Sequence, residues 1–297
     1  MNSIATPVPQ ENEPILETDI EVFRENLNLR SFMFSHTLAD HPLFEIPRLA
    51  RLARSLSGNP KHYAYMAGDL VVDKGWKQAQ PPPLSLEECI LQIHSANSWA
   101  ILKHTELDPE YQRLMEQFKH EFTELSGWDL AIETKDWEAQ IMITSPGRVT
   151  PYHIDNECNF LLQIGGEKVI NIFDQTDREV LSDEELEYFW AANENAAQYK
   201  PQYQERAYVY RLAPGKVVHL PVNAPHWLKN GENVSISLSI NCELVNLPQG
   251  RVFEANYYLR QLGVKPTPPG RSALRDRLKS CLVRTARTLK HAFHGRS

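Results

Sequence analysis

The feature that most restricts the fold is a change in sequence texture after Asp136. From there to residue 245, short runs rich in β-branched and aromatic residues alternate with turns containing Gly, Pro or Asn. Strands are predicted at 139–144, 160–164, 167–173, 207–212, 216–220 and 234–242. Strands this short and this regularly interrupted are typical of an all-β barrel or jelly roll. An insertion at 175–206 is expected to contain a helix over about 182–195, with acidic residues in its first turn.

The chain before this region has a different pattern. Residues 1–30 begin with a proline-rich stretch and are expected to form a flexible lead. Within 31–135, apolar residues recur at helical spacing over 43–56 and 109–125, and Ser85 with Glu88 forms an N-cap signature. We therefore expect a mainly helical region packed on the barrel, with short strands such as 99–103. With helices again over 246–297, the expected fold class is mixed α+β.

Composition limits the class of protein. A hydrophobic fraction of 42% with 23% charged residues is ordinary for a globular chain. No apolar run approaches the roughly 20 residues of a membrane-spanning helix, and the first residues lack the apolar core of a signal peptide. The four cysteines (Cys89, Cys158, Cys242 and Cys281) have no CxxC spacing and are interpreted as reduced thiols. These features predict a cytoplasmic protein without a transmembrane segment.

The net charge of −7 is unevenly distributed. From Arg271 to the end there are eight Lys and Arg residues against one acid, Asp276, so the preceding residues carry about −14. A body this acidic argues against a general nucleic-acid surface, which requires a basic face. No nucleic-acid partner is therefore expected, although the basic tail alone could contact an anionic partner.

A candidate metal site begins at His153 and Asp155. In an extended segment, residues two apart point to the same face, so the imidazole and the carboxylate lie together. A second histidine from a distant strand would complete a set of two histidines and one carboxylate, which suits Fe(II) and leaves coordination positions open. Asn156 and Glu157 could compete with Asp155, but their spacing from His153 is less suitable.

The second histidine is expected after the strand at 216–220. His226 stands between Pro225 and Trp227, as in the second histidine position of a cupin-type barrel. His219, within the strand itself, is the competing candidate.

Lys168 is a candidate for binding an anion. On the strand at 167–173 it shares a face with Ile170 and Ile172. If that face is the barrel interior, the ammonium group needs an anion or loses its proton. A dicarboxylate co-substrate would supply one. The alternative is a lysine at the barrel mouth with its charged end in water.

The strand at 234–242 alternates apolar residues with Ser235, Ser237, Ser239 and Asn241. Such a face is either solvated or lines a polar cavity. Small uncharged residues are unusual on a solvated face, which favours a cavity lining.

Taken together, these motifs resemble a known family. The stretch from Thr150 to Lys168 resembles the JmjC hydroxylases, especially those acting on asparagine, and the whole chain resembles bacterial cupin-like proteins of the jumonji type. The supporting segments are His41-Pro42-Leu43-Phe44, Gly68-Asp69, Asn97-Ser98-Trp99, Ser145-Pro146-Gly147 and Ala224-Pro225-His226-Trp227. The resemblance covers about residues 32–270 and implies a double-stranded β-helix (cupin or jelly-roll) core.

The resemblance also implies roles for individual residues. It implies Fe(II) bound by His153, Asp155 and His226, and Lys168 paired with the distal carboxylate of 2-oxoglutarate. It further implies that Thr150 hydrogen-bonds the same end of 2-oxoglutarate; it places two asparagines, Asn159 and Asn241, near the co-substrate. The chain departs from the family in its insertion at 175–206 and lacks the segments that bind protein substrates, so the primary substrate does not carry over.

Two functional hypotheses follow. The first is a dioxygenase that uses Fe(II), 2-oxoglutarate and O2 to hydroxylate a protein side chain or a small molecule, releasing succinate and CO2. The second is a non-catalytic cupin that serves as a metal-binding, small-ligand-binding or regulatory module. Lys168 discriminates between them, because a sensor needs no co-substrate clamp. A cupin using Mn or Zn in an isomerase or hydrolase is less favoured, because the third ligand is a carboxylate.

The C-terminal tail forms a basic amphipathic pattern. Its apolar residues recur at helical spacing; they are Leu274, Leu278, Leu282, Ala286, Leu289 and Phe293. Three interpretations remain open: a helix packed on its own domain, a homodimer interface built from C-terminal helices as in related JmjC hydroxylases, and docking on an anionic surface such as a membrane.

Overall fold

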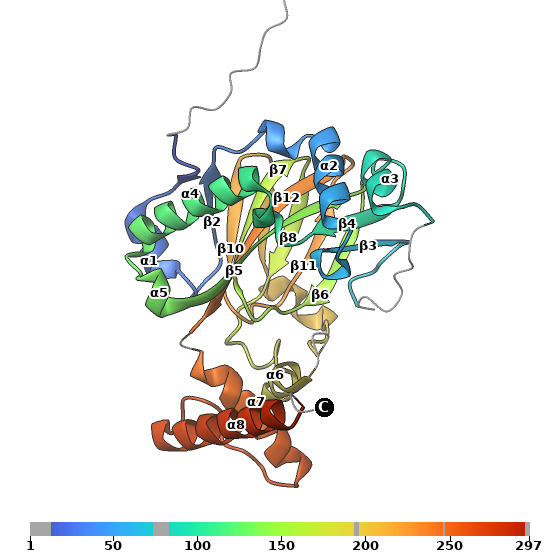
Figure 1. The fold of residues 1–297 in the computed structure, drawn as a ribbon. Coiled ribbons are helices and arrows are strands. Elements are labelled where there is room, and N and C mark those ends of the chain that lie inside the picture. Colours follow the sequence, from blue (N-terminus) through green and yellow to red (C-terminus); the bar gives the residue numbers. More distant parts are fainter. Residues whose placement is uncertain (1–12, 74–82, 193–195, 246, 295–297) are drawn as a thin grey trace, which may run out of the picture.

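The computed structural model describes residues 13–73, 83–192, 196–245 and 247–294. Its centre consists of two antiparallel sheets (Figure 1). The larger sheet has the strand order β1 (Leu16–Glu17), β2 (Phe32–His36), β10 (Lys216–Leu220), β7 (Cys158–Gly165), β12 (Ser235–Leu244), β5 (Thr134–Thr144), β4 (Ser98–Leu102) and β3 (Tyr63–Ala67). The smaller sheet has the order β6 (Val149–His153), β11 (His226–Asn230), β8 (Lys168–Ile172) and β9 (Tyr208–Leu212).

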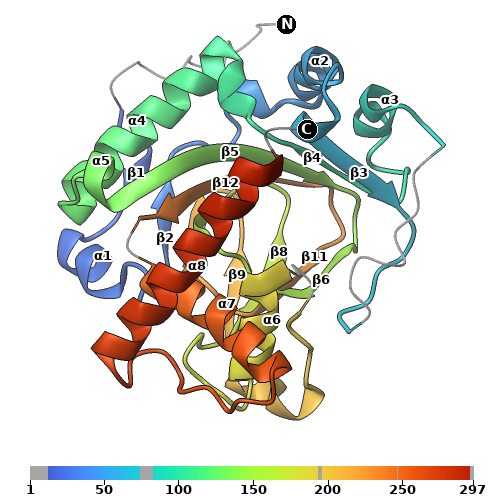
Figure 2. The same ribbon diagram turned by 60° about the horizontal axis from the view of Figure 1, so that its bottom comes forward.

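Helices lie in two groups. The first group lies along the larger sheet and comprises α1 (Ile20–Asn26), α2 (Ile46–Leu56), α3 (Leu86–Leu91), α4 (Pro109–Ser126) and α5 (Leu130–Glu133). The second group lies at the other end of the molecule (Figure 1), where its helices pack together (Figure 2), and comprises α6 (Asp183–Ala192), α7 (Pro248–Gln261) and α8 (Ala273–His294). Short 3-10 helices are η1 (Pro42–Phe44), η2 (Pro60–His62), η4 (Thr105–Leu107) and η5 (Pro201–Arg206).

The larger sheet separates two apolar cores. On β7, Phe160 and Leu162 point to the helix side, where Phe160 packs with Phe118 and Phe122 of α4. Leu161 points to the opposite side and packs with residues of the smaller sheet such as Ile170. This period-2 alternation follows from strand geometry. The space between the sheets is therefore the barrel interior, and the expected mixed α+β fold with a jelly-roll core is confirmed.

Local signals place the helices where the sequence predicts them. Ser85 and Glu88 form a reciprocal capping box at the start of α3. Asp108 caps α4, whose first residue is Pro109, and Gly127 ends it in the left-handed conformation. The helix predicted within the insertion is α6; residues 193–195, at its predicted end, lie outside the described residues.

The N-terminal segment differs from the expected flexible lead over 1–30. Residues 1–12 lie outside the described residues, but β1 and α1 follow directly after them. Ile15, Leu16, Phe23 and Leu27 are buried, and the Phe23 ring lies 5.8 Å from that of Phe122. Burial of these apolar side chains compensates for the entropy of ordering the segment.

The region 31–135 also contains more strand than its mainly helical pattern predicts. Besides β4, it contributes β2 and β3, which extend the larger sheet on either side. Both strands lie in that sheet through long-range pairing, β2 with β10 and β3 with β4. Among the described helices, none is long and apolar enough to cross a membrane.

Candidate metal centre and co-substrate pocket

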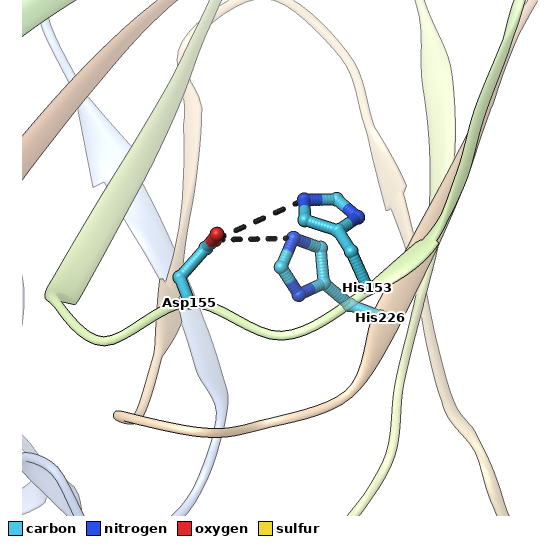
Figure 3. A group of neighbouring side chains, drawn as sticks. All are labelled: His153, Asp155 and His226. Atoms are coloured by element: carbon cyan, nitrogen blue, oxygen red, sulfur yellow. Dashed lines mark ion pairs between the residues drawn. The ribbon is translucent and has the colours of Figure 1, made fainter. Parts of the chain in front are cut away.

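Two neighbouring strands bring the candidate ligands together. His153 ends β6 and His226 begins β11, and the two residues are directly paired across the sheet. Their ring centroids are 4.1 Å apart. Asp155 follows β6, and its Oδ2 lies 3.9 Å from His153 Nε2 and 3.6 Å from His226 Nε2 (Figure 3). The structure thus assembles residues from two distant segments into one group.

The histidine rings are oriented by the main chain. His153 Nδ1 lies 2.7 Å from the carbonyl oxygen of Pro151, and His226 Nδ1 lies 3.0 Å from that of Ala224. A carbonyl oxygen can only accept, so each Nδ1 carries the proton and donates it. The Nε2 atoms then present lone pairs towards Asp155, which is the tautomer that a metal requires.

The donor set fits a divalent transition metal. One ligand atom from each of His153, Asp155 and His226 lies within 4.8 Å of the others. Donors bound to one ion at about 2.1 Å lie roughly 3 Å apart, so small side-chain rotations suffice to bring all three onto an ion. Burial, together with the neighbouring His153, lowers the pKa of His226 to about 4 despite the opposing effect of Asp155. His226 is therefore neutral, as a ligand must be.

Glu157 lies beside this group without joining it. Burial and the negative charge of Asp155 raise its pKa to about 7. Within the described residues, the set of potential ligands contains Asp155 and not Glu157. This arrangement agrees with the spacing argument that ranked Asp155 first.

His219, the competing histidine, lies in a different environment. On β10 it points to the helix side of the larger sheet, where its ring stacks on Phe160 at 4.6 Å. Its Nδ1 donates to the Asn159 carbonyl oxygen (3.0 Å), and its Nε2 accepts from the Asn28 main-chain N–H (2.9 Å). Burial lowers its pKa to about 3. Both ring nitrogens are engaged in the core, which leaves His226 as the histidine that faces His153.

Lys168 lies inside the barrel. Only 4% of its surface is exposed, and it shares its face with the buried Ile170 and Ile172. Burial is the sole cause that lowers its pKa, to about 7, and no described residue forms an ion pair with it. A buried ammonium group without a countercharge is costly. The side chain is thus suited to bind an anion.

Polar side chains line the barrel wall opposite Lys168. Ser235, Ser237, Ser239 and Asn241 are all buried. Their partners lie on β7: Ser237 donates to Gln163 Oε1 (2.7 Å), and the Asn159 amide donates to Ser239 (2.5 Å) and to Asn241. Because Leu161, between these β7 residues on the same face, packs in the interior core, the polar face points into the barrel interior rather than to solvent.

Thr150 lies near Lys168 across one strand. Thr150 on β6 is paired with Leu228 of β11, and Lys168 on β8 is paired with Asn230 of the same strand. Leu228 packs in the interior core, so Thr150 is also directed to that side. The candidate co-substrate residues on the smaller sheet thus flank β11.

One residue near the site was not predicted. Asn223 precedes His226 in the loop between β10 and β11, and its main-chain N–H donates to the Asp155 carbonyl oxygen (2.9 Å). Its φ of 63° is in the left-handed region, which asparagine tolerates better than most residues. An asparagine in a short turn was the only available signal.

Comparisons with known proteins support the fold. No protein-family model and no curated protein matches the sequence. YcfD, a ribosomal oxygenase from Escherichia coli solved with cobalt and 2-oxoglutarate, aligns with a TM-score of 0.54 and 16% identity over 92% of this chain and 68% of that chain. The YcfD complex with cobalt and succinic acid aligns with a TM-score of 0.50 and 16% identity, over the same shares of the two chains. The chain therefore shares its fold with an oxygenase whose solved structures contain a metal and 2-oxoglutarate.

Proposed function

We propose that this chain is an Fe(II)- and 2-oxoglutarate-dependent dioxygenase that hydroxylates a C–H bond of a protein side chain or a small molecule. The observation that carries the proposal is Lys168, a buried ammonium group in the same barrel as His153, Asp155 and His226. A metal site alone suits many functions. A metal site with a buried cation suits a negatively charged co-substrate.

Each residue has a role in this proposal. His153, Asp155 and His226 would hold Fe(II), and a set of two histidines and one carboxylate suits an iron that reacts with 2-oxoglutarate and O2. Lys168 pairs with the distal carboxylate, and Thr150 hydrogen-bonds the same end. On the opposite sheet, Asn159 and Asn241 are hydrogen-bonded to each other and would orient the co-substrate.

The proposed reaction balances as follows. One substrate C–H, 2-oxoglutarate and O2 yield one substrate C–OH, succinate and CO2. Bound iron supplies the oxidation chemistry. The chain itself would position 2-oxoglutarate between Lys168 and the metal ligands, orients both imidazole rings through hydrogen bonds at Nδ1, and excludes water with apolar residues such as Ile170 and Ile172.

The alternative, a non-catalytic cupin that binds a metal or a small ligand, requires no buried lysine. Retaining an ammonium group at 4% exposure destabilises the fold unless an anion binds. This cost favours the catalytic proposal. We also propose a cytoplasmic location, because the four cysteines are scattered along the chain without the spacing of a disulfide framework.

The direct test is turnover. Protein reconstituted with Fe(II) should convert 2-oxoglutarate to succinate in air, slowly alone and faster with its primary substrate in a fractionated lysate. The control variant is Lys229→Ala, which removes an exposed lysine from β11 in place of the buried Lys168 and should retain this activity. An iron-loaded wild type that neither binds 2-oxoglutarate nor releases succinate would support the non-catalytic alternative.

A further inference from the structure

The loop at 221–225, between β10 and β11, leads directly into His226 and is hydrogen-bonded to the segment that carries Asp155. Its Asn223 main-chain N–H donates to the Asp155 carbonyl oxygen (2.9 Å). The next residue, Ala224, accepts the Nδ1 proton of His226 (3.0 Å). Any movement at Asn223 therefore acts on the Asp155 main chain and on the carbonyl group that orients His226.

The side chain of Asn223 is held by the inserted segment. Trp190, on α6, donates its indole N–H to Asn223 Oδ1 (3.2 Å). The φ of 63° at Asn223 is unfavourable for most residues, so this contact helps to maintain a conformation that the turn requires. The hydrogen bond joins the insertion at 175–206 to the ligand-bearing loop.

Trp190 also packs against helix α7. The main chain of Gly250 on α7 lies against the indole, and a Cβ added there would come within 2.6 Å of the ring. Glu187, buried on α6, forms an ion pair with Arg260 of α7 at 2.7 Å. The indole is thus fixed between α7 and the loop, and it contributes to both the helix-side core and the core around Tyr152.

We propose that Trp190 and Asn223 form a positioning pair that sets the relative placement of Asp155 and His226. This inference rests on the proposed metal function and assigns a role to the insertion. Removing a residue that supports the metal ligands through hydrogen bonds commonly weakens metal binding by about 10- to 100-fold, because such residues orient the donor atoms. Trp190 acts through Asn223 and does not contact the metal ligands' donor atoms itself.

Two single variants and their combination test the pair. Trp190→Phe retains an aromatic ring and removes the N–H donor. Asn223→Gly retains access to the positive φ and removes the acceptor. Co(II) is the probe: its affinity is measured by calorimetry, and its visible absorption reports the ligand geometry. Trp137→Phe is the matched control, since Trp137 also donates its indole N–H to a side-chain oxygen, that of Thr134 (2.9 Å), away from the site.

We expect each single variant to bind Co(II) about tenfold more weakly and to alter its visible spectrum, with a melting temperature close to that of Trp137→Phe. The double variant should lose about the same factor of ten, because both changes break one interaction. Trp137→Phe should retain wild-type affinity and spectrum.

Opposite results overturn the inference. Single variants within twofold of wild type, or a double variant whose loss is the product of the two, would show that the residues do not act as a pair. If Trp190→Phe fails to fold, Asn223→Gly decides alone by the same measurements. A wild type that binds no Co(II) would instead reject the metal centre, and with it this inference, so the two failures are distinguishable.

Discussion

At the scale of single residues, burial determines which groups can do chemistry. His219 and His226 are both buried and both neutral, with their pKa lowered to about 3 and about 4. They differ in their neighbours. His219 uses both nitrogens within the core, whereas the Nε2 of His226 points to Asp155 at 3.6 Å. Neighbours, more than burial, decide which of them can be a ligand.

This difference gives the first prediction. His226→Ala should weaken Fe(II) binding by more than about 100-fold, because a direct ligand contributes more than the partners behind it. His219→Ala should retain Fe(II) affinity and instead lower the free energy of unfolding by about 2–4 kcal/mol, through lost packing and hydrogen bonds. Anaerobic metal titration with denaturant unfolding measures both. An iron-free His219→Ala beside an iron-replete His226→Ala would reverse the assignment.

The second prediction concerns Lys168. Lys168→Ala should weaken 2-oxoglutarate binding by about 1.5–3 kcal/mol, or roughly 10- to 150-fold, because a charge-assisted bond to the distal carboxylate is lost. Calorimetry on Mn(II)-loaded protein without oxygen measures the affinity. Lys229→Ala on neighbouring β11 is exposed and serves as the control. Equal affinities in wild type and Lys168→Ala would favour the non-catalytic alternative.

The third prediction concerns pH. Burial lowers the pKa of Lys168 to about 7. In the protein without 2-oxoglutarate, this side chain is therefore mostly charged at about pH 6 and mostly neutral at about pH 8.5. A bound dicarboxylate stabilises the charged form. Binding should therefore take up nearly one proton at about pH 8.5 and almost none at about pH 6, and affinity should fall as pH rises above about 7. Calorimetry in buffers of different ionisation enthalpy counts the protons, and a heat independent of buffer at high pH would contradict it.

At the scale of elements, the turn between β7 and β8 connects the larger sheet to the smaller sheet. Gly166, between β7 and β8, has a φ of +67°, and an added Cβ would lie 2.1 Å from the Val234 carbonyl oxygen. The turn leads from β7 in the larger sheet to β8, the strand that carries Lys168 in the smaller sheet. A side chain there would push β8 away from the start of β12.

The fourth prediction is a graded series at glycines. Gly166→Ala should lower the free energy of unfolding by about 2–4 kcal/mol, through main-chain strain and a steric clash. Gly147→Ala, with a φ of +70° and open space around it, should cost only about 1 kcal/mol. Gly58→Ala, which has open space and ordinary φ, should change stability by less than about 1 kcal/mol. Urea unfolding measures all three, and equal effects at the three sites would refute the steric argument.

At the scale of the whole molecule, the notable surface is on α8. Leu274, Leu278 and Leu282 are 70%, 57% and 70% exposed, whereas Val283 on the opposite face is buried. Interchain burial of the leucines would remove an apolar stripe from water. The basic tail would then lie against an acidic body in the second copy.

The fifth prediction follows from this surface. We expect the full chain to form a homodimer through its C-terminal helices, and a chain ending at Gly270 to be a monomer. Light scattering measures the mass of both. Leu278→Glu in the full chain is a milder variant and should also shift the equilibrium to monomer. A full-length chain that is monomeric and does not bind anionic vesicles would show that α8 packs only on its own chain. Binding to the vesicles would instead favour a membrane partner.

Much of this protein was predictable from local pattern. The alternation in β8 placed Lys168 on the same face as Ile170, and the pairing of His153 with Asp155 followed from period-2 geometry. Helix boundaries such as Pro109 and Gly127 follow from capping chemistry. These features depend on residues a few positions apart, whose geometry the backbone sets directly.

The sequence by itself thus determined the barrel strands β5, β7, β8, β9, β10 and β12, the turns between them, the faces of their side chains and a short set of candidate ligands, but it did not mark β6 and β11 as strands. Tertiary structure decided the choice between His219 and His226, because the pairing of β10 with β2 and β7 turns His219 towards the helix side. It also ordered β1 and α1 against α4, and it brought Trp190 to Asn223. Each of these outcomes depends on contacts between segments far apart in the chain, and such contacts are set by packing of the whole molecule rather than by local pattern.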